Sequence, residues 1–109
     1  MSQIVDLEKD QSLKRMDVAL VSIAVDSKEE LGQEAKRLNI QTPMLSDEDA
    51  AVTKSYGIPL TYGGEPGHTF VLVGKDGRIK WAKDYAAPQN GGLMYVKVDE
   101  LRSEVASRL

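Results

Sequence analysis

The run of residues 68–81, HTFVLVGKDGRIKW, constrains the fold of this chain more than any other stretch. Its first half is rich in β-branched, aromatic and aliphatic side chains, and its second half alternates polar and apolar residues with a period of two. Between them, Gly74-Lys75-Asp76-Gly77 supplies residues that tolerate the positive φ of a tight turn. The run therefore predicts a β-hairpin with antiparallel strands at 69–73 and 78–82. We expect both faces of the first strand to be apolar because helices cover both sides.

The remaining segments alternate between helical and extended patterns. Residues 17–25, DVALVSIAV, form a nearly continuous apolar run, which is typical of a central strand covered on both faces. Ser27 with Glu30 forms a capping-box pattern ahead of a helix whose apolar residues include Leu31 and which ends at Asn39. The other expected elements are a helix at 2–15, an extended stretch at 42–47, a helix at 48–56 that buries Val52 and Tyr56, loops at 58–67 and 86–92, and a closing helix at 98–109 capped by Asp99.

Composition bounds the class of protein. The chain has 109 residues, the size of one globular domain, and we expect a single domain over 1–109. Its 14 basic and 17 acidic residues give a net charge of -3 and no basic stripe, which argues against binding to nucleic acid or to an anionic membrane surface. No apolar run approaches the roughly 20 residues that span a bilayer, and the N-terminus lacks the pattern of a secretory signal. A cytoplasmic location is therefore expected.

The chain contains no cysteine, which excludes disulfides, thiolate metal sites and thiol catalysis by its own side chains. The other candidate sites are weak. His68 is the only histidine, and we interpret it as a packed or surface residue rather than an acid-base group. The acidic run Asp47-Glu48-Asp49 lacks the spacing of a calcium loop and suits the first turn of a helix. Neither a metal nor a cofactor is expected, and no residue is assigned a catalytic role.

A longer pattern points to a known family. In residues 21–58 a strand ending in Val-Asp is followed by a helix, by Pro-Met-Leu-Ser-Asp, and by a helix ending in Tyr-Gly. With the hairpin and closing helix after it, this order resembles the thioredoxin-like peroxiredoxins of the alkyl hydroperoxide reductase/thiol-specific antioxidant group and their redoxin relatives. The resemblance covers roughly residues 4–109. It implies an α/β fold, the thioredoxin-like three-layer sandwich, truncated at its N-terminus and ending in a β-hairpin and a closing helix.

The resemblance also implies an activity, thiol peroxidase or disulfide reductase, and a place for its cysteine. In such proteins the cysteine lies at the start of the helix whose remainder would be residues 2–15, and it is missing here. Family members commonly carry an arginine or a cis-proline at the position of Gly67, and Pro66 is one position away from it. The loop that would border a substrate groove contains Tyr62, Pro66, Gly67, His68 and Thr69.

Two classes of function follow. The first is a redoxin-like domain without a thiol nucleophile, inactive by itself, which is either a fragment of a longer oxidoreductase or a relative kept as a binding module. The second is an enzyme that uses non-thiol groups in the loops 58–67 and 85–92. We favour the first, because peroxide reduction of this type requires a thiolate.

The resemblance finally predicts a gap in the sheet, since the family's strand between 17–25 and 69–73 has no counterpart. Either these two strands pair directly, or a strand from another chain inserts. Because residues 18–25 are too apolar for an exposed edge, we expect a homo-oligomer or another strand-completing partner.

Overall fold

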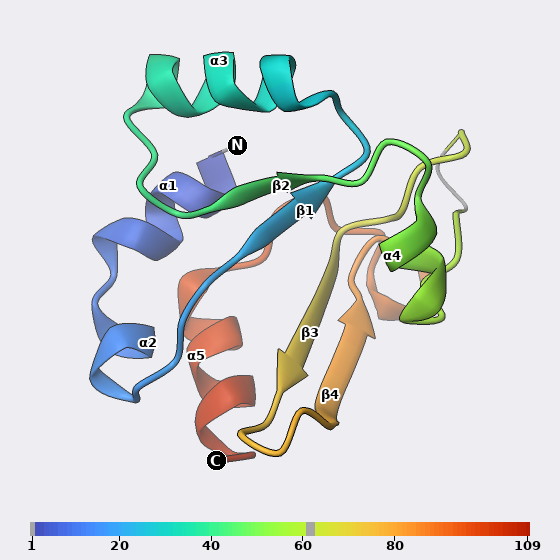
Figure 1. Ribbon diagram of the computed structural model, residues 1–109. Coiled ribbons are helices and arrows are strands. Elements are labelled where there is room, and N and C mark those ends of the chain that lie inside the picture. Colours follow the sequence, from blue (N-terminus) through green and yellow to red (C-terminus); the bar gives the residue numbers. More distant parts are fainter. Residues whose placement is uncertain (1, 61–62) are drawn as a thin grey trace. The chain divides into compact units, whose positions relative to one another are not determined.

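The computed structural model describes residues 2–60 and 63–109, and the chain divides into two compact units, Met1–Ser55 and Tyr56–Leu109. Both contain helices and strands, so the chain is a mixed α/β protein, and its elements are labelled in Figure 1. Whether the two units form the single domain expected from the sequence stays a prediction.

The first unit contains α1 (Ser2–Lys9), α2 (Ser12–Arg15), β1 (Ser22–Ala24), α3 (Lys28–Leu38), β2 (Met44–Ser46) and α4 (Ala51–Ser55). The second contains β3 (Thr69–Val73), β4 (Ile79–Asp84), the 3₁₀ helix η1 (Pro88–Asn90) and α5 (Val98–Ala106).

The predicted helix at 2–15 is two helices, because the chain breaks at Asp10. The Asp10 carboxylate accepts a hydrogen bond from the backbone N–H of Ser12 at 2.8 Å. An aspartate side chain that bonds the backbone two residues later competes with the helical ladder, so it ends one helix and begins the next. The short α2 ends in turns at Met16 and Asp17, and Asp17 has a φ of 60°.

The strand predicted at 17–25 is shorter and less covered than its composition suggests. Only Ser22–Ala24 form β1, which pairs in parallel with β2, and Ile23 lies opposite Leu45. The side chains of Val21, Ile23 and Leu45 are 49%, 43% and 51% exposed. The prediction of a strand covered on both faces is therefore wrong for this chain.

The helix after β1 follows its sequence signals closely. Ser27 Oγ accepts a hydrogen bond from the Glu30 N–H at 3.2 Å and donates to Glu30 Oε1 at 3.0 Å, which confirms the predicted cap. Asn39 ends α3 in the left-handed conformation with a φ of 54°. Leu31 is buried, and α3 packs against β2.

The next helix is shorter than predicted, Ala51–Ser55, and buries a different face. Thr53 is its buried residue, whereas Val52 and Tyr56 are 44% and 41% exposed. The predicted burial of Val52 and Tyr56 is wrong because a helix of one turn and a half is too short to carry an apolar stripe. A hydrogen bond between side chains decides which face of the helix is buried. That bond runs from the Thr53 hydroxyl to the buried carboxylate of Asp47 at 2.7 Å.

The hairpin predicted in the second unit is confirmed. Strands β3 and β4 are antiparallel, with Thr69 opposite Asp84 and a register irregularity between Leu72 and Val73. The turn closes through a hydrogen bond from the Gly74 N–H to the Arg78 carbonyl at 2.8 Å, and Gly77 has a φ of 81°. Val73 is nevertheless 45% exposed, so the expectation that helices cover both faces fails at this end of the strand.

The closing helix α5 begins without the predicted Asp99 cap. Its N-cap is Lys97, which makes no side-chain capping bond, and Asp99 lies in the first turn, where it pairs with Arg102 at 2.5 Å. Leu101 and Val105 are buried as the periodicity predicted. The loop predicted at 86–92 contains the 3₁₀ helix η1.

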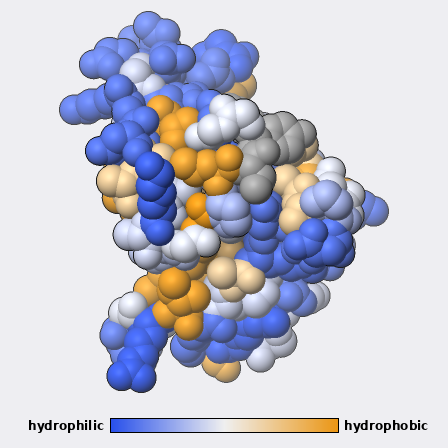
Figure 2. Space-filling model, turned by 90° about the vertical axis from the view of Figure 1, so that its right-hand side faces the viewer, coloured by the Kyte–Doolittle hydropathy of each residue, from blue (hydrophilic) through white to orange (hydrophobic). Residues whose placement is uncertain are grey.

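Among the described residues, β1–β2 and β3–β4 are two separate two-stranded sheets. Apolar side chains remain at the surface of both units, and orange atoms lie among the hydrophilic blue ones on the face drawn in Figure 2. None of the helices within 2–60 and 63–109 is long and apolar enough to cross a membrane.

Candidate functional site

The predicted groove loop leads directly into β3. Of its five residues, Tyr62 lies outside the described part of the chain, so the structure gives it no position. Thr69 Oγ1 donates a hydrogen bond to the Gly67 carbonyl at 3.1 Å, and the His68 carbonyl accepts one from the Tyr85 N–H at 2.9 Å. The described part of the loop is thus fixed to the end of β4.

Gly67 is buried because its backbone lies directly against Asp84. A Cβ atom at this position would stand 2.6 Å from Asp84 Oδ1 and 3.1 Å from the Ala86 Cβ. Asp84 is itself held in place, since its Oδ1 accepts a hydrogen bond from the Ala86 N–H at 3.0 Å. A larger residue at 67, such as the arginine that the family resemblance led us to consider, would have to displace the Asp84 carboxylate.

His68 is partly buried and its ring packs against a neighbouring aromatic ring. Its ring meets the Phe70 ring edge-on, with the centroids 5.3 Å apart. Burial lowers the pKa of His68 below its ordinary value of 6.5, although the nearby Asp84 charge acts in the opposite direction. This environment fits the interpretation of His68 as a packed residue.

An aromatic cluster within the second unit includes His68 and continues along β3 and β4. Phe70 and Trp81 each meet the ring of Tyr85 edge-on, at centroid distances of 6.0 and 6.4 Å. Lys83 Nζ lies 4.6 Å from the centroid of the Tyr85 ring, and Tyr85 is only 2% exposed. The cluster is a core whose rings pack in the edge-on geometry that aromatic side chains prefer.

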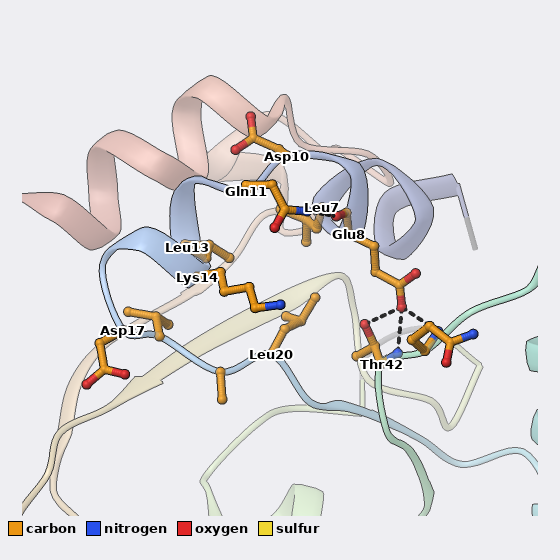
Figure 3. Close-up of a pocket in the computed structure, with 12 residues that line it drawn as sticks. Leu7, Glu8, Asp10, Gln11, Leu13, Lys14, Asp17, Leu20 and Thr42 are labelled. Atoms are coloured by element: carbon orange, nitrogen blue, oxygen red, sulfur yellow. Dashed lines mark hydrogen bonds between the residues drawn. The ribbon is translucent and has the colours of Figure 1, made fainter.

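The first unit contains a cavity that sequence patterns did not reveal, with a volume of about 630 Å³ (Figure 3). It lies between α1, α2, the segment that leads into β1, and the residues before β2. Its lining residues are Leu7, Glu8, Asp10, Gln11, Leu13, Lys14, Asp17, Val18, Ala19, Leu20, Gln41 and Thr42. No single sequence motif predicts this cavity, because its lining residues come from segments more than 30 residues apart.

One wall of this cavity is fixed by Glu8. Its Oε1 accepts hydrogen bonds from the Thr42 hydroxyl at 2.6 Å, the Thr42 N–H at 2.5 Å and the Gln41 N–H at 2.7 Å. The hydrogen bonds from Thr42, the hydroxyl above all, hold the pKa of Glu8 below its ordinary value of 4.5. Glu8 therefore ties α1 to the chain before β2. These contacts of Glu8 are structural. Among the residues that line the cavity, Lys14 is the single basic one.

The acidic run 47–49 lies before α4 and not in its first turn as predicted, and Asp47 and Asp49 accept hydrogen bonds from the start of that helix. Asp47 accepts hydrogen bonds from the Val52 N–H, the Thr53 N–H and the Thr53 hydroxyl. These bonds, those from Thr53 foremost, lower the pKa of Asp47. In the described part of the chain, no three histidine, aspartate or glutamate side chains gather as metal ligands would.

Comparison with known proteins then identifies the family. Residues 2–82 match the model of the AhpC/TSA family, which is more than half of the chain. The chain belongs to the AhpC/TSA family. None of the curated proteins compared with it matches.

Two solved structures share the fold of this AhpC/TSA chain. Mycobacterium bovis AhpC is 20% identical with a TM-score of 0.77, and Mycobacterium tuberculosis AhpC is 19% identical with a TM-score of 0.79. Each match covers 97% of this chain. The predicted thioredoxin-like fold is thereby confirmed. The chain spans 62% and 59% of those two proteins, less than two thirds of their length.

Proposed function

We propose that this chain is a redoxin-type domain without peroxidase or disulfide-reductase activity of its own, and that a further polypeptide strand completes its β1–β2 sheet. In a solution of the pure chain, a second copy supplies that strand. The observation that carries the proposal is the outer edge of β1, which has no hydrogen-bonded strand among the described residues and adjoins the exposed apolar residues Val21, Ile23 and Leu45.

The absence of activity follows from composition. The thiolate is both the nucleophile and the electron donor in thiol-based peroxide reduction, and the chain has no cysteine. His68 provides no substitute, because an imidazole has no sulfur that peroxide could oxidise and a thiol could reduce again. The partly buried position of His68 also gives little support to the second class of function, an enzyme that uses non-thiol groups in the loops 58–67 and 85–92.

The case for a partner strand rests on the unpaired edge of β1 and on the apolar residues beside it. Parallel strands are found almost only where both faces are covered, and here one face is open. Val21 and Ile23 alternate onto that face, and the register places Leu45 beside Ile23. The edge of β1 opposite β2 has no hydrogen-bonded strand among the described residues, so it can accept one.

Activity is tested by following hydrogen peroxide or an organic hydroperoxide in the presence of a dithiol. We expect no catalytic turnover above a protein-free control, and saturable turnover by the pure chain would overturn this half of the proposal.

Association is tested by light scattering across a dilution series, with Ile23→Lys and a matched control, Val52→Lys. Ile23 and Val52 are almost equally exposed, at 43% and 44%, but Val52 lies on α4. We expect the wild type and Val52→Lys to associate as concentration rises, and Ile23→Lys to remain monomeric. A wild type that stays monomeric, or two variants that dissociate alike, would rule out the β1–β2 face as the contact.

A further inference from the structure

Among the methionines of residues 2–60 and 63–109, Met94 is the most exposed. Its side chain is 55% exposed, whereas Met16 and Met44 are both partly buried. Its neighbours Leu93 and Tyr95 are 42% and 39% exposed. Three consecutive large apolar residues therefore lie at the surface of the second unit, and we call them the 93–95 patch.

The chain holds this patch in place from both ends. On one side the Leu93 N–H donates a hydrogen bond to the Tyr85 carbonyl at 2.7 Å, after Gly91 and Gly92 have turned the chain with φ values of 101° and 61°. On the other side Val96 is only 1% exposed. Because both flanks are anchored, the backbone of the 93–95 patch is held at the surface of the second unit.

An exposed thioether reacts with hydroperoxides in a defined way. A lone pair on Sδ attacks one oxygen of the peroxide, the O–O bond breaks, and an S–O bond forms. The sulfur loses two electrons, and the peroxide is reduced to water or to an alcohol after the leaving oxygen takes up a proton. The product, methionine sulfoxide, is polar where the thioether was apolar.

We propose that Met94 is the residue at which hydroperoxides preferentially modify the described part of this chain, and that its sulfoxide makes the 93–95 patch polar. The step consumes one peroxide for each Met94, so it is a modification and not a catalytic cycle. It does not depend on the proposed completion of the β1–β2 sheet, which involves other residues.

The first test measures where oxygen is added. The native chain is treated with limiting hydrogen peroxide, quenched and digested with trypsin, which places Met16, Met44 and Met94 on separate peptides, 16–28, 38–54 and 84–97. We expect peptide 84–97 to gain one oxygen at least about threefold faster than the other two, because oxidation follows exposure. Met1 lies outside the described residues, and its peptide, 1–9, is followed separately.

The control repeats the treatment in denaturant, where the three rates should converge because no fold distinguishes the methionines. If Met16 or Met44 reacts as fast as Met94 in the native chain, or if the order persists in denaturant, the proposal is wrong.

The second test measures the patch itself. Retention on a hydrophobic-interaction column should fall after peroxide treatment of the wild type and stay unchanged for Met94→Leu, which keeps the apolar surface but has no sulfur. Equal losses of retention in the two proteins would show that oxidation elsewhere alters the surface, and would overturn the assignment of the patch.

Discussion

Ile23 and Leu45 lie opposite each other in the parallel register of β1 and β2, and both side chains are close to half exposed. Apolar residues that face each other across a parallel pair normally lie under a helix or another layer of chain. Here they form the centre of an open apolar face. The apolar pattern of residues 17–25 therefore predicts a covered strand, whereas the structure has a strand of three residues beside an exposed apolar face.

Hydrogen exchange at β1 should report the arrival of a partner strand. The Ser22 N–H donates to the Pro43 carbonyl and the Ala24 carbonyl accepts from the Asp47 N–H, so these residues point toward β2. By the alternation of a parallel strand, the Ile23 N–H points to the opposite edge. We expect the Ile23 amide to become protected as concentration rises, while the Ser22 amide is protected throughout. A monomer in which the Ile23 amide is already protected would contradict this expectation.

Two glycine substitutions should change stability in opposite directions. Gly77 has a φ of 81° in the hairpin turn, so Gly77→Val should lower the free energy of unfolding by about 1 kcal/mol or more. Gly32 lies within α3, and a Cβ there would meet no atom within 4 Å. Gly32→Ala should therefore raise the free energy of unfolding by about 0.5–1 kcal/mol, because alanine favours a helix. Urea denaturation measures both, and a stabilising Gly77→Val would disprove the turn geometry.

Thr42→Val should raise the pKa of Glu8. The variant removes the hydroxyl that donates to Glu8 Oε1, and this hydrogen bond is the largest cause of the depressed pKa. NMR titration of the Glu8 carboxyl should show its pKa move toward the ordinary value of 4.5. In the control Thr53→Val, the Asp47 pKa should rise instead, while that of Glu8 stays where it was.

The sign of the effect on stability follows from the same shift. Because the pKa of Glu8 is lower in the folded chain than in the unfolded one, Glu8 contributes stability above its unfolded pKa, near 4.5. That contribution is lost as the pH falls through the folded value. In Thr42→Val the loss between neutral and acid pH should be smaller than in the wild type. Equal pH profiles for the two proteins would show that the hydroxyl does not stabilise the Glu8 anion.

Local signals predicted the elements whose cause is local. The hairpin at 69–84 follows from turn glycines and alternation, and α3 begins and ends where Ser27 and Asn39 place it. Two of the failures arise where one polar group decides between alternatives of similar energy. Asp10 divides the first helix by bonding to the Ser12 N–H, and Thr53 turns α4 by bonding to Asp47. The periodicity of apolar residues predicts neither the break at Asp10 nor the burial of Thr53.

The candidate sites divide in the same way. The association of Asp47 with the start of a helix could be anticipated, because it depends on near neighbours in the sequence. The close approach of Gly67 to Asp84 joins residues 17 positions apart, and the cavity beside Glu8 depends on Thr42, 34 positions away. Contacts of that range are fixed by tertiary packing, which no short motif encodes.

Tyr85 should contribute far more through its ring than through its hydroxyl. The ring is 2% exposed and lies against Phe70 and Trp81, so Tyr85→Ala should lower the free energy of unfolding by about 3–5 kcal/mol. The hydroxyl donates to Glu100 Oε2 at 3.1 Å, and burial together with this bond raises the pKa of Tyr85. Because Glu100 is exposed and water can replace the lost donor, Tyr85→Phe should cost only about 0.5–1.5 kcal/mol.

An exposed tyrosine provides the matched control for this pair. Tyr56 is 41% exposed, so Tyr56→Ala should change the free energy of unfolding by no more than about 0.5 kcal/mol. Urea unfolding of the three variants separates the contributions, since the same side chain is removed from a core and from a surface. If Tyr85→Phe destabilises the chain as much as Tyr85→Ala does, the hydrogen bond to Glu100 carries the stabilisation. The aromatic packing of β3 and β4 would then be the minor contribution.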